Sequence, residues 1–584
     1  MQESRKFTFE DYMGGLNKAG QKLIDNYSTN FKGYQHDNRS IAITYLNFFS
    51  KIAINPHELY KVNNFCLDYF QSQQKIWNSV FLKQEKEDSV SVSPKKNDKR
   101  FSGEEWKIPY FNFIKQNYLL TEQLAERIIS QIEIGDKARK KMVFYNQHFI
   151  DLFSPANFLA TNPEALKLAM DTKGQSLVDG FKNLVKDIEK GQITQTDESA
   201  FEVGKNLAIT NGAVIYENEL MQLIQYLPTT KNVHEIPLLM IPPWINKYYI
   251  LDLQPENSLV KFLIDKGITV YMISWRNPCP RNAHLTFDDY VMEGALKAIE
   301  IAKEVSGVQK INTLGYCLGG TLLGVASAIL SKDKKNNPIN STTLLATMID
   351  FIDVGPMGNV IDEALVKKLD RGELLNDGIL HGHDMERAFN LIRSNDLIWH
   401  YAVNSYLKGL KPSAFDVLYW TNDNTNLPAN MYKYYIHRII LENGLSRKNA
   451  LTICGKQIDI GKIEFPVFVI GFIEDYISPA KTSFITTRMV SGPVEFILGG
   501  SGHVMGAINP PVKKKYGYWL NGNLEGDFDK WKDSATHYEG SWWNPWSDRL
   551  LEKSGKEVPA KRELGNRTYS VIEAAPGSYV KQGC

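Results

Sequence analysis

The feature that most constrains this chain is a tight turn at residues 315–320, Gly-Tyr-Cys-Leu-Gly-Gly, with Cys317 at its apex. Residues 308–314 before the turn favour a buried strand, and apolar residues at helical spacing follow from Thr321 to Leu330. Strand, turn and helix are the context of a nucleophile elbow, G-x-S-x-G, here with sulfur in place of the serine oxygen. The pattern predicts a nucleophilic thiol at the N-terminus of a helix, whose dipole favours a thiolate.

The hexapeptide alone also fits an ordinary core cysteine, because short glycine patterns recur by chance and buried thiols are common. The surrounding chain narrows the choice. Apolar runs at 237–241, 268–273, 310–314, 343–349 and 466–471 alternate with helical segments, after shorter strand-like runs at 207–210, 212–216 and 221–226. This alternation predicts a parallel sheet covered on both faces. With the elbow, it predicts an α/β fold of the α/β-hydrolase type.

The domain organisation follows from where the pattern changes. Residues 1–200 are rich in amphipathic helical spacing, and 201–584 carry the strand–helix alternation of a catalytic domain. More than a hundred residues between Ile349 and Phe465 interrupt the alternation. In an α/β-hydrolase, an insertion at this point would lie over the active site, so we expect a cap at about 351–440.

Composition excludes several classes of protein. The formal net charge of +1 gives no electrostatic reason to expect nucleic acid or an anionic membrane as a partner. No apolar run approaches the roughly 18 residues of a membrane span. Five scattered cysteines and an N-terminus without an apolar signal core favour a reducing cytoplasm.

The partners expected for Cys317 lie beyond it, because an α/β-hydrolase places its acid and then its histidine after the nucleophile. Of the 11 histidines, only His503 and His537 follow the last strong apolar run, and His503 alone comes after a strand end and a glycine-rich loop. Parallel sheets carry their active sites at such loops. Asp475 directly follows the 466–471 run and is the predicted acid. The alternatives are Asp350, Asp353 and Glu474.

The oxyanion hole is expected to combine two backbone amides. One belongs to Leu318, the residue after the nucleophile. The other belongs to Trp244 or Ile245, in the loop after the 237–241 run, since Pro242 and Pro243 have no N–H. No metal or other cofactor is required, and His381 with His383 is a poor metal pair because no further ligands cluster nearby.

At this point the sequence resembles the polyhydroxyalkanoate synthases, in particular class I poly(3-hydroxybutyrate) synthases. The resemblance covers roughly residues 100–580. It rests on several motifs in order: Pro-Pro-Trp-Ile-Asn-Lys-Tyr-Tyr-Ile-Leu-Asp-Leu at 242–253, Ser-Trp-Arg-Asn-Pro at 274–278, the elbow at 315–320, Trp-Thr-Asn-Asp at 420–423 with Asn-Leu-Pro at 426–428, and Ser-Gly-His at 501–503 through Asn-Pro at 509–510. Shorter matches are Phe101 near Trp106, 154–158 and 203–207.

The resemblance implies a helical N-terminal region followed by an α/β-hydrolase domain, with Cys317, Asp475 and His503 as the catalytic triad. It implies that (R)-3-hydroxyacyl-CoA, with 3-hydroxybutyryl-CoA as the expected substrate, is polymerised into polyester through a cysteine acyl-enzyme. A homodimer, phasin-like partners and a cytoplasmic location on polyester granules are implied too, with the N-terminal region as the expected attachment. Trp244 departs from the family, whose members often have a small residue there.

Two other functions stay open from the sequence. A thioesterase, esterase or polyester depolymerase would share the fold, although serine is the usual nucleophile for ester hydrolysis. A catalytically inactive scaffold on the granule surface is the alternative from a different class.

Overall fold

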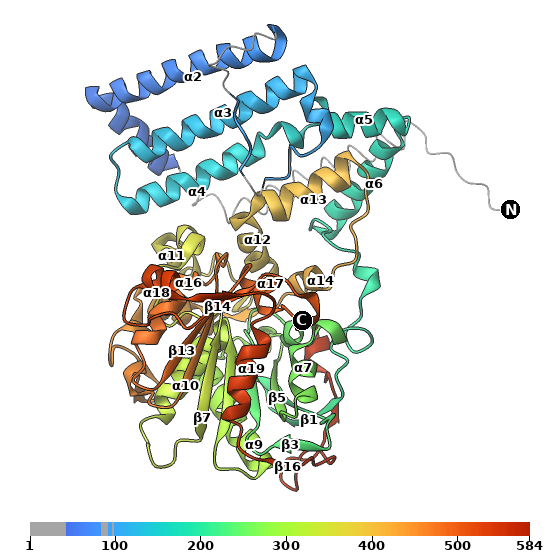
Figure 1. Cartoon of the computed structure of the whole chain (residues 1–584), viewed down its shortest axis with the longest axis vertical. Helices are drawn as coiled ribbons and strands as arrows, with labels where there is room; N and C mark the ends of the chain where they lie inside the picture. The colour runs from blue at the N-terminus through green and yellow to red at the C-terminus, as the bar shows by residue number, and fades with distance from the viewer. Residues whose placement is uncertain (1–41, 83–90, 96–97, 584) are drawn as a thin grey trace, which may run out of the picture. The chain divides into compact units, whose positions relative to one another are not determined.

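The computed structural model describes residues 42–82, 91–95 and 98–583, and the chain divides into two compact units (Figure 1). The helical unit comprises the chain up to Asp197 together with Arg387–Ser413. The sheet unit comprises Glu198–Glu386 and Ala414–Cys584. Residues 1–41 of the predicted N-terminal domain, and Cys584, lie outside the described residues.

Amphipathic helices form the helical unit. After a helix over residues 42–54, its main helices are α2 (Pro56–Leu82), α3 (Pro109–Gln131), α4 (Asp136–Leu152), α5 (Pro163–Asp171) and α6 (Gln175–Lys190). Proline opens α3 and α5, at a position where a backbone N–H would have no acceptor within the helix. Asn162 caps α5 by accepting a hydrogen bond from the Ala165 amide (3.0 Å). The unit buries small apolar cores, one around Trp106 and one around Ile132.

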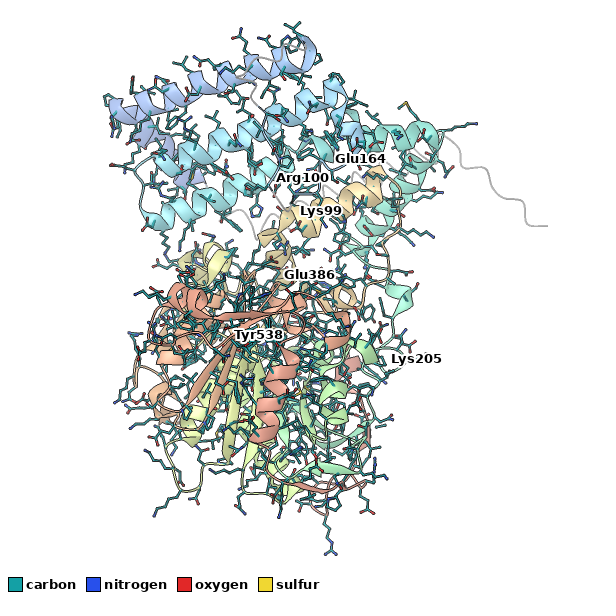
Figure 2. All side chains as sticks on the ribbon, viewed as in Figure 1. Lys99, Arg100, Glu164, Lys205, Glu386 and Tyr538 are labelled. Carbon is teal, nitrogen blue, oxygen red and sulfur yellow. The ribbon has the colours of Figure 1, made fainter. Side chains whose placement is uncertain are left out.

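Residues 387–413, a segment from within the predicted cap insertion, complete the helical unit. The segment contains α13 (His400–Ala402) between the π-helical turns η10 (Asn395–Trp399) and η11 (Val403–Leu407). Two hydrogen bonds attach this segment to α5 and α6. Lys408 donates to Glu164 (2.6 Å), and Tyr406 donates to Asp187 (2.8 Å); Glu164 is labelled in Figure 2. The insertion is thus divided between the two units.

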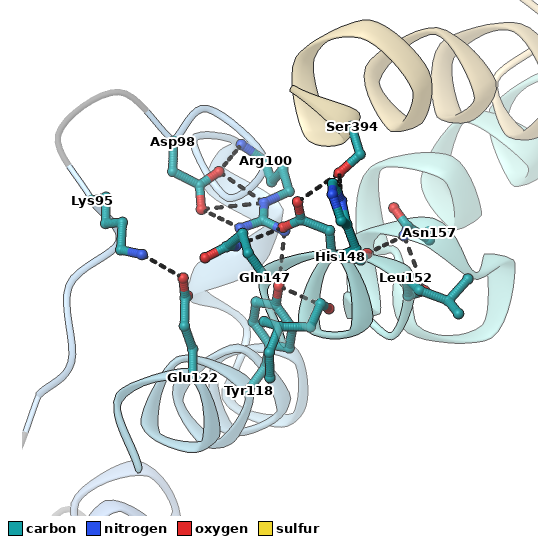
Figure 3. Close-up of polar contacts among 12 residues, drawn as sticks. Lys95, Asp98, Arg100, Tyr118, Glu122, Gln147, His148, Leu152, Asn157 and Ser394 are labelled. Carbon is teal, nitrogen blue, oxygen red and sulfur yellow. Dashed lines mark hydrogen bonds and ion pairs between the residues drawn. The ribbon is translucent and has the colours of Figure 1, made fainter. Parts of the chain in front are cut away.

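Figure 3 shows the polar network at the start of this segment. The guanidinium of Arg100 donates to Asp98 (2.8 Å), Asp151 (3.2 Å) and the Tyr118 hydroxyl (2.8 Å). Ser394 donates to the second carboxylate oxygen of Asp151 (2.9 Å). Charged groups with so little exposure are stable only with such partners. Through Asp151 and Tyr118, the network joins residues 387–413 to α3 and α4.

An eleven-stranded sheet organises the other unit, with the strand order β15-β14-β13-β12-β7-β6-β4-β5-β2-β1-β17. Its strands are β1 (Gly212–Glu217), β2 (Met221–Tyr226), β4 (Leu238–Ile241), β5 (Val270–Trp275), β6 (Ile311–Tyr316), β7 (Ile339–Leu345), β12 (Val467–Phe472), β13 (Val494–Gly499), β14 (Tyr518–Leu520), β15 (Thr536–Tyr538) and β17 (Glu573–Ala574). The central six, from β13 to β5, are parallel.

Helices cover both faces of this sheet, as predicted. The main ones are α7 (Leu259–Asp265), α9 (Lys297–Ser306), α10 (Leu318–Leu330), α16 (Ala480–Ile485), α17 (His503–Ala507) and α19 (Trp543–Glu552). Successive residues of β4 enter different cores: Leu239 and Ile241 one, Leu238 and Met240 the other. Burial on both sides explains why the central strands are continuously apolar.

Three expectations about strands were wrong. The sheet is parallel only in its centre, because β1, β2, β14, β15 and β17 pair antiparallel at its two sides. Residues 207–210 form no strand: Ala208 has φ 53° and its amide donates to the Asp252 carbonyl (3.0 Å). The run at 343–349 belongs to a strand that starts at Ile339 and stops at Leu345, since Ala346 has φ 47°.

Candidate active site

Cys317 stands at the apex between β6 and α10, in a backbone conformation that few residues adopt. Its φ of 53° with ψ of −123° is strained for a residue with a side chain. The surrounding structure holds it there: its amide donates to the Leu345 carbonyl (2.9 Å), and its carbonyl accepts from the Gly320 amide (2.9 Å). The thiol is half-buried. Strain maintained in this way fixes the thiol at the carboxyl edge of the central strands.

The glycines of the elbow are required by close approach. A Cβ on Gly315 would collide with the backbone of Gly320, and one on Gly319 would collide with the Ile241 and Pro242 carbonyls. The start of α10 therefore lies directly against the end of β4 and the loop that follows it.

Asp475 and His503 form a buried pair. Asp475 lies three residues after β12, and His503 opens α17 after the glycine-rich loop that follows β13. One Asp475 oxygen contacts His503 Nδ1 (2.7 Å), while the other accepts from the Ile477 and Ser478 amides (both 2.8 Å). The Asp475 side chain is fully buried and that of His503 is 6% exposed. The carboxylate therefore has one side fixed by backbone and the other aimed at the imidazole.

Electrostatics favour the cationic form of this histidine. Burial alone would lower the pKa of His503, but the charges and hydrogen bonds of Asp475 and Cys317 outweigh it and raise that pKa to about 10. Because Nδ1 faces Asp475, the other ring nitrogen is the one available to Cys317, whose interaction with the imidazole contributes to the raised pKa. Tyr316 stacks on the imidazole with ring centroids 5.5 Å apart. Cysteine, histidine and aspartate thus form one connected chain.

The alternative acids and the second histidine have other partners. Asp350 accepts from Asn443 (2.8 Å), and Asp353 accepts from the Gly355 amide (2.9 Å). The Glu474 side chain is exposed. His537 lies on β15, 3.8 Å from Glu539. No contact between any of these groups and Cys317 or His503 is seen, whereas Asp475 meets His503 directly.

The two predicted oxyanion donors lie on neighbouring segments. Leu318 is the first residue of α10, so its amide has no acceptor within the helix. Ile245 lies in the loop after β4, and its carbonyl accepts from the Thr425 amide (3.3 Å), which fixes the loop's direction. The contact of Gly319 with the Ile241 and Pro242 carbonyls brings this loop to the elbow.

Sequence reasoning singled out Trp244 but missed Tyr435, the aromatic residue that packs against it. Trp244 is buried and packs edge-on against Tyr435, with ring centroids 5.5 Å apart. Burial raises the pKa of Tyr435 well above its ordinary value, and the charge of Cys317 adds to the rise. Tyr435 comes from the distant π-helical segment η12 (Tyr435–Leu441). No local spacing could have connected it to Cys317.

The residues considered for a metal are dispersed. His381 lies 3.4 Å from the Asn376 side chain, and His383 lies 3.6 Å from Glu386. Across the part of the chain that the structure describes, no three His, Cys, Asp or Glu side chains gather in a way that could hold a metal ion.

Comparison with known proteins places this site in a family. Residues 97–263 match the model of the poly-beta-hydroxybutyrate polymerase (PhaC) N-terminus, and residues 236–508 match that of the alpha/beta hydrolase fold. A poly(3-hydroxyalkanoate) polymerase subunit PhaC from Cupriavidus necator is 39% identical over 95% of this chain and 94% of its own length. The chain belongs to the poly(3-hydroxyalkanoate) polymerase family.

Other family members match at similar levels. The poly(3-hydroxyalkanoate) polymerase subunit PhaC of Rhizobium meliloti is 40% identical over 83% of this chain and 80% of its own length. The poly(3-hydroxyalkanoate) polymerase of Methylorubrum extorquens is 40% identical over 88% of this chain and 85% of its own length. The chain is accordingly an acyltransferase that forms polyhydroxyalkanoate, on an α/β-hydrolase fold. No helix among the described residues combines the length and apolar content needed to cross a bilayer.

Proposed function

We propose that this enzyme polymerises (R)-3-hydroxyacyl-CoA, with 3-hydroxybutyryl-CoA as its substrate, through an acyl-enzyme on Cys317. The observation that carries the proposal is the chain of contacts from Asp475 through His503 to Cys317, at an elbow whose strain is held by its neighbours. A thiol nucleophile suits a thioester substrate, because the attacking and leaving groups are alike and the acyl-enzyme keeps its reactivity.

In the first half-reaction, Cys317 sulfur attacks the thioester carbonyl after its proton passes to His503. The carbonyl oxygen becomes an oxyanion, which the amides of Leu318 and of Ile245 or Trp244 receive. The bond to the CoA sulfur then breaks, and the CoA thiolate leaves with the proton that His503 returns. An imidazole held cationic by Asp475 is well suited to this second proton transfer.

In the second half-reaction, the 3-hydroxyl of another acyl unit attacks the Cys317 thioester. His503 accepts the hydroxyl proton, an ester C–O bond forms, and the Cys317 C–S bond breaks. The 2.7 Å contact supports a role for Asp475 in orienting and stabilising the imidazolium. Activation of the incoming hydroxyl through His503 uses the same contact and is the second role open to this carboxylate.

Water must be kept from the acyl-enzyme, because hydrolysis would end the chain. We assign this task to the part of the 351–440 insertion in the sheet unit, which supplies Tyr435 against Trp244. The bulky Trp244, where relatives often have a small residue, narrows the space beside the oxyanion loop.

The decisive experiment incubates the purified protein with 3-hydroxybutyryl-CoA and follows free CoA, insoluble polymer and soluble hydroxyacid. Free CoA with polymer supports the proposal, and soluble hydroxyacid alone would identify a thioesterase. Cys317→Ala is expected to abolish both CoA release and polymer, whereas polymer formation unaffected by this change would show that Cys317 is not the acyl carrier. A scaffold without activity would give neither free CoA nor polymer even with Cys317 in place. A chain-length series of hydroxyacyl-CoA substrates then defines the acyl preference.

We also propose that the enzyme works at the surface of its product. A growing polyester is apolar and separates from water, so an enzyme attached to the chain end is carried to the inclusion. Tyr60, Leu67 and Phe70 on α2 are more than half exposed and offer apolar contact to such a surface. Phasin-like proteins on the same granule and a homodimer are the further partners we expect.

A further inference from the structure

A buried lysine follows the predicted oxyanion donor by two residues. Lys247 is only 4% exposed, and its ammonium donates to the backbone carbonyl of Gln582 (3.0 Å). Burial lowers the pKa of Lys247, and the charge of Asp423 works in the opposite direction. Lysines are rarely buried, because desolvating the ammonium is costly unless the surroundings compensate. The burial of this lysine and its bond to the Gln582 carbonyl therefore point to a specific role.

The loop that carries Lys247 is fastened at several points. The Pro242 carbonyl accepts from the Trp275 indole (2.9 Å), and the Lys247 carbonyl accepts from the Trp420 indole (2.6 Å). These bonds hold the backbone at its two ends. The Lys247 ammonium adds a link from the second of these ends to a segment more than 300 residues later.

That segment, residues 573–583, is here called the C-terminal strap, and it is itself firmly attached. It begins with β17, which pairs with β1, and its Tyr579 amide donates to the Gln222 side chain (3.1 Å) while the Tyr579 hydroxyl donates to the Asn218 carbonyl (2.7 Å). The guanidinium of Arg276 lies 3.9 Å from the centroid of the Tyr579 ring. The strap therefore offers Lys247 a fixed acceptor.

The position of this loop matters because the elbow touches it. The backbone at Gly319 leaves no space for a Cβ beside the Ile241 and Pro242 carbonyls. A small displacement of the loop would therefore change the distance between its amides and an oxyanion formed on the Cys317 adduct. Misplacement by about 1 Å can cost around 100-fold in rate.

We propose that Lys247 is a positioning residue for acyl transfer: its bond to the Gln582 carbonyl anchors the oxyanion loop to the C-terminal strap, which makes the strap part of the catalytic apparatus. The inference rests on the proposed function, since it takes Cys317 as the acyl carrier and the loop as an oxyanion donor. Lys247 itself touches neither substrate nor thiol in this role.

The test compares two reactions of the same thiol. Lys247→Met keeps the length of the side chain but removes the donor. We expect its kcat for CoA release from 3-hydroxybutyryl-CoA to fall by about 10- to 100-fold, with KM within about 3-fold, as for an impaired oxyanion site. Alkylation of Cys317 by iodoacetamide, followed on the Cys317 peptide by mass spectrometry, forms no oxyanion at an acyl carbon and is expected to keep its rate within about 2-fold.

A matched control is available in the sheet unit. Lys266 is more exposed, at 26% of its side chain, but it too joins distant segments, donating to Ser547 and Asp548 (both 2.8 Å), and it lies directly after α7, outside the oxyanion loop. Lys266→Met is expected to leave both the acyl transfer and the alkylation rates unchanged.

A second variant keeps the proposal falsifiable if Lys247→Met fails to fold. A chain ending at Lys581 lacks the Gln582 carbonyl and is expected to show the same separation of the two reactions. Combining it with Lys247→Met is expected to add little further loss of acyl transfer beyond that of the truncation, because the truncation already removes the acceptor of the Lys247 ammonium. Equal losses of acyl transfer and alkylation, or full acyl transfer in both variants, would overturn the inference. Polymer formation by Cys317→Ala would instead refute the proposed function.

Discussion

The sheet unit and the helical unit bury their apolar residues to very different degrees. Every residue of β4, β6 and β12 is buried, and the two cores on either face of the sheet continue into the covering helices. In α2, by contrast, Glu58 and Ile76 are the two buried residues among 27, and large apolar side chains face outward. The first arrangement gives a rigid frame, and the second leaves apolar surface without an internal partner.

The difference suits two kinds of task. A strained elbow at Cys317 can be maintained only where the surrounding packing is worth more than the strain. The helical unit instead relies on a polar network around Arg100 to hold a segment that comes from the cap insertion. We therefore expect substitutions in the sheet unit to change catalysis. Substitutions in the helical unit are expected to change the polar network or the proposed contact with polyester.

The largest effect is expected at His503. His503→Ala removes the group that lies between Cys317 and Asp475, so both proposed proton transfers lose their carrier. We expect kcat/KM for CoA release to fall by about 1,000-fold, a typical value for a general acid–base residue. Thermal stability should also fall, because the fully buried Asp475 carboxylate loses its cationic partner, so activity is measured well below the unfolding temperature of the variant. His537→Ala on the edge strand β15 is the matched control and should retain full activity.

A smaller loss with a distinct pH signature is expected for Asp475→Asn. The carboxylate helps raise the pKa of His503 to about 10. Its removal lowers that pKa and so reduces the fraction of His503 that is protonated at alkaline pH. We expect kcat/KM to fall by about 100-fold at neutral pH, and the alkaline limb of its pH profile to move down by at least about one unit. An unchanged alkaline limb in the variant would contradict the assignment.

Much of this site could be predicted from sequence because its signals are local. The elbow is recognised from two glycines and the strand and helix around them, and Asp475 and His503 each follow a buried strand directly. Chain order then fixed which acid and which histidine to expect. The central strands were found for the same reason, since burial on both faces makes them continuously apolar.

The parts that were missed depend on contacts across long stretches of chain. Tyr435 reaches Trp244 only after the insertion folds back, and the Gln582 carbonyl has no side-chain signal at all. The antiparallel strands β14, β15 and β17 are two or three residues long, too short for any periodicity to register. The division of the insertion at Arg387 likewise follows from side-chain partners, not from composition.

In the helical unit, Arg100→Met is expected to loosen the polar network without touching the catalytic groups. The change leaves Asp98 and Asp151 without their cation, at a cost of about 2 kcal/mol after allowance for partial exposure of the guanidinium. Hydrogen exchange in α4 and in residues 387–413 should accelerate by about 30-fold. Arg127→Met, whose ion pair with Asp68 is half-exposed, should change exchange by no more than about 2-fold.

The smallest effect on stability, and the clearest contrast with the sheet unit, is expected on α2. Replacing both Leu67 and Phe70 with Ser removes two side chains that are 58% and 63% exposed. The free energy of unfolding should therefore change by no more than about 0.5 kcal/mol per residue. If the helical unit attaches the enzyme to its product, binding to poly(3-hydroxybutyrate) particles should weaken several-fold, because apolar area is lost from the contact.

The control for this variant is a pair of apolar residues in the sheet unit that are at least as exposed. Ile352 and Val512 are 74% and 72% exposed, and replacing both with Ser removes a comparable apolar area from that unit. Unchanged particle binding in this control, with weakened binding in the α2 variant, would assign attachment to the helical unit. Equal losses in the two variants would show that particle binding depends on exposed apolar area in general, and the division of tasks between the units would then be wrong.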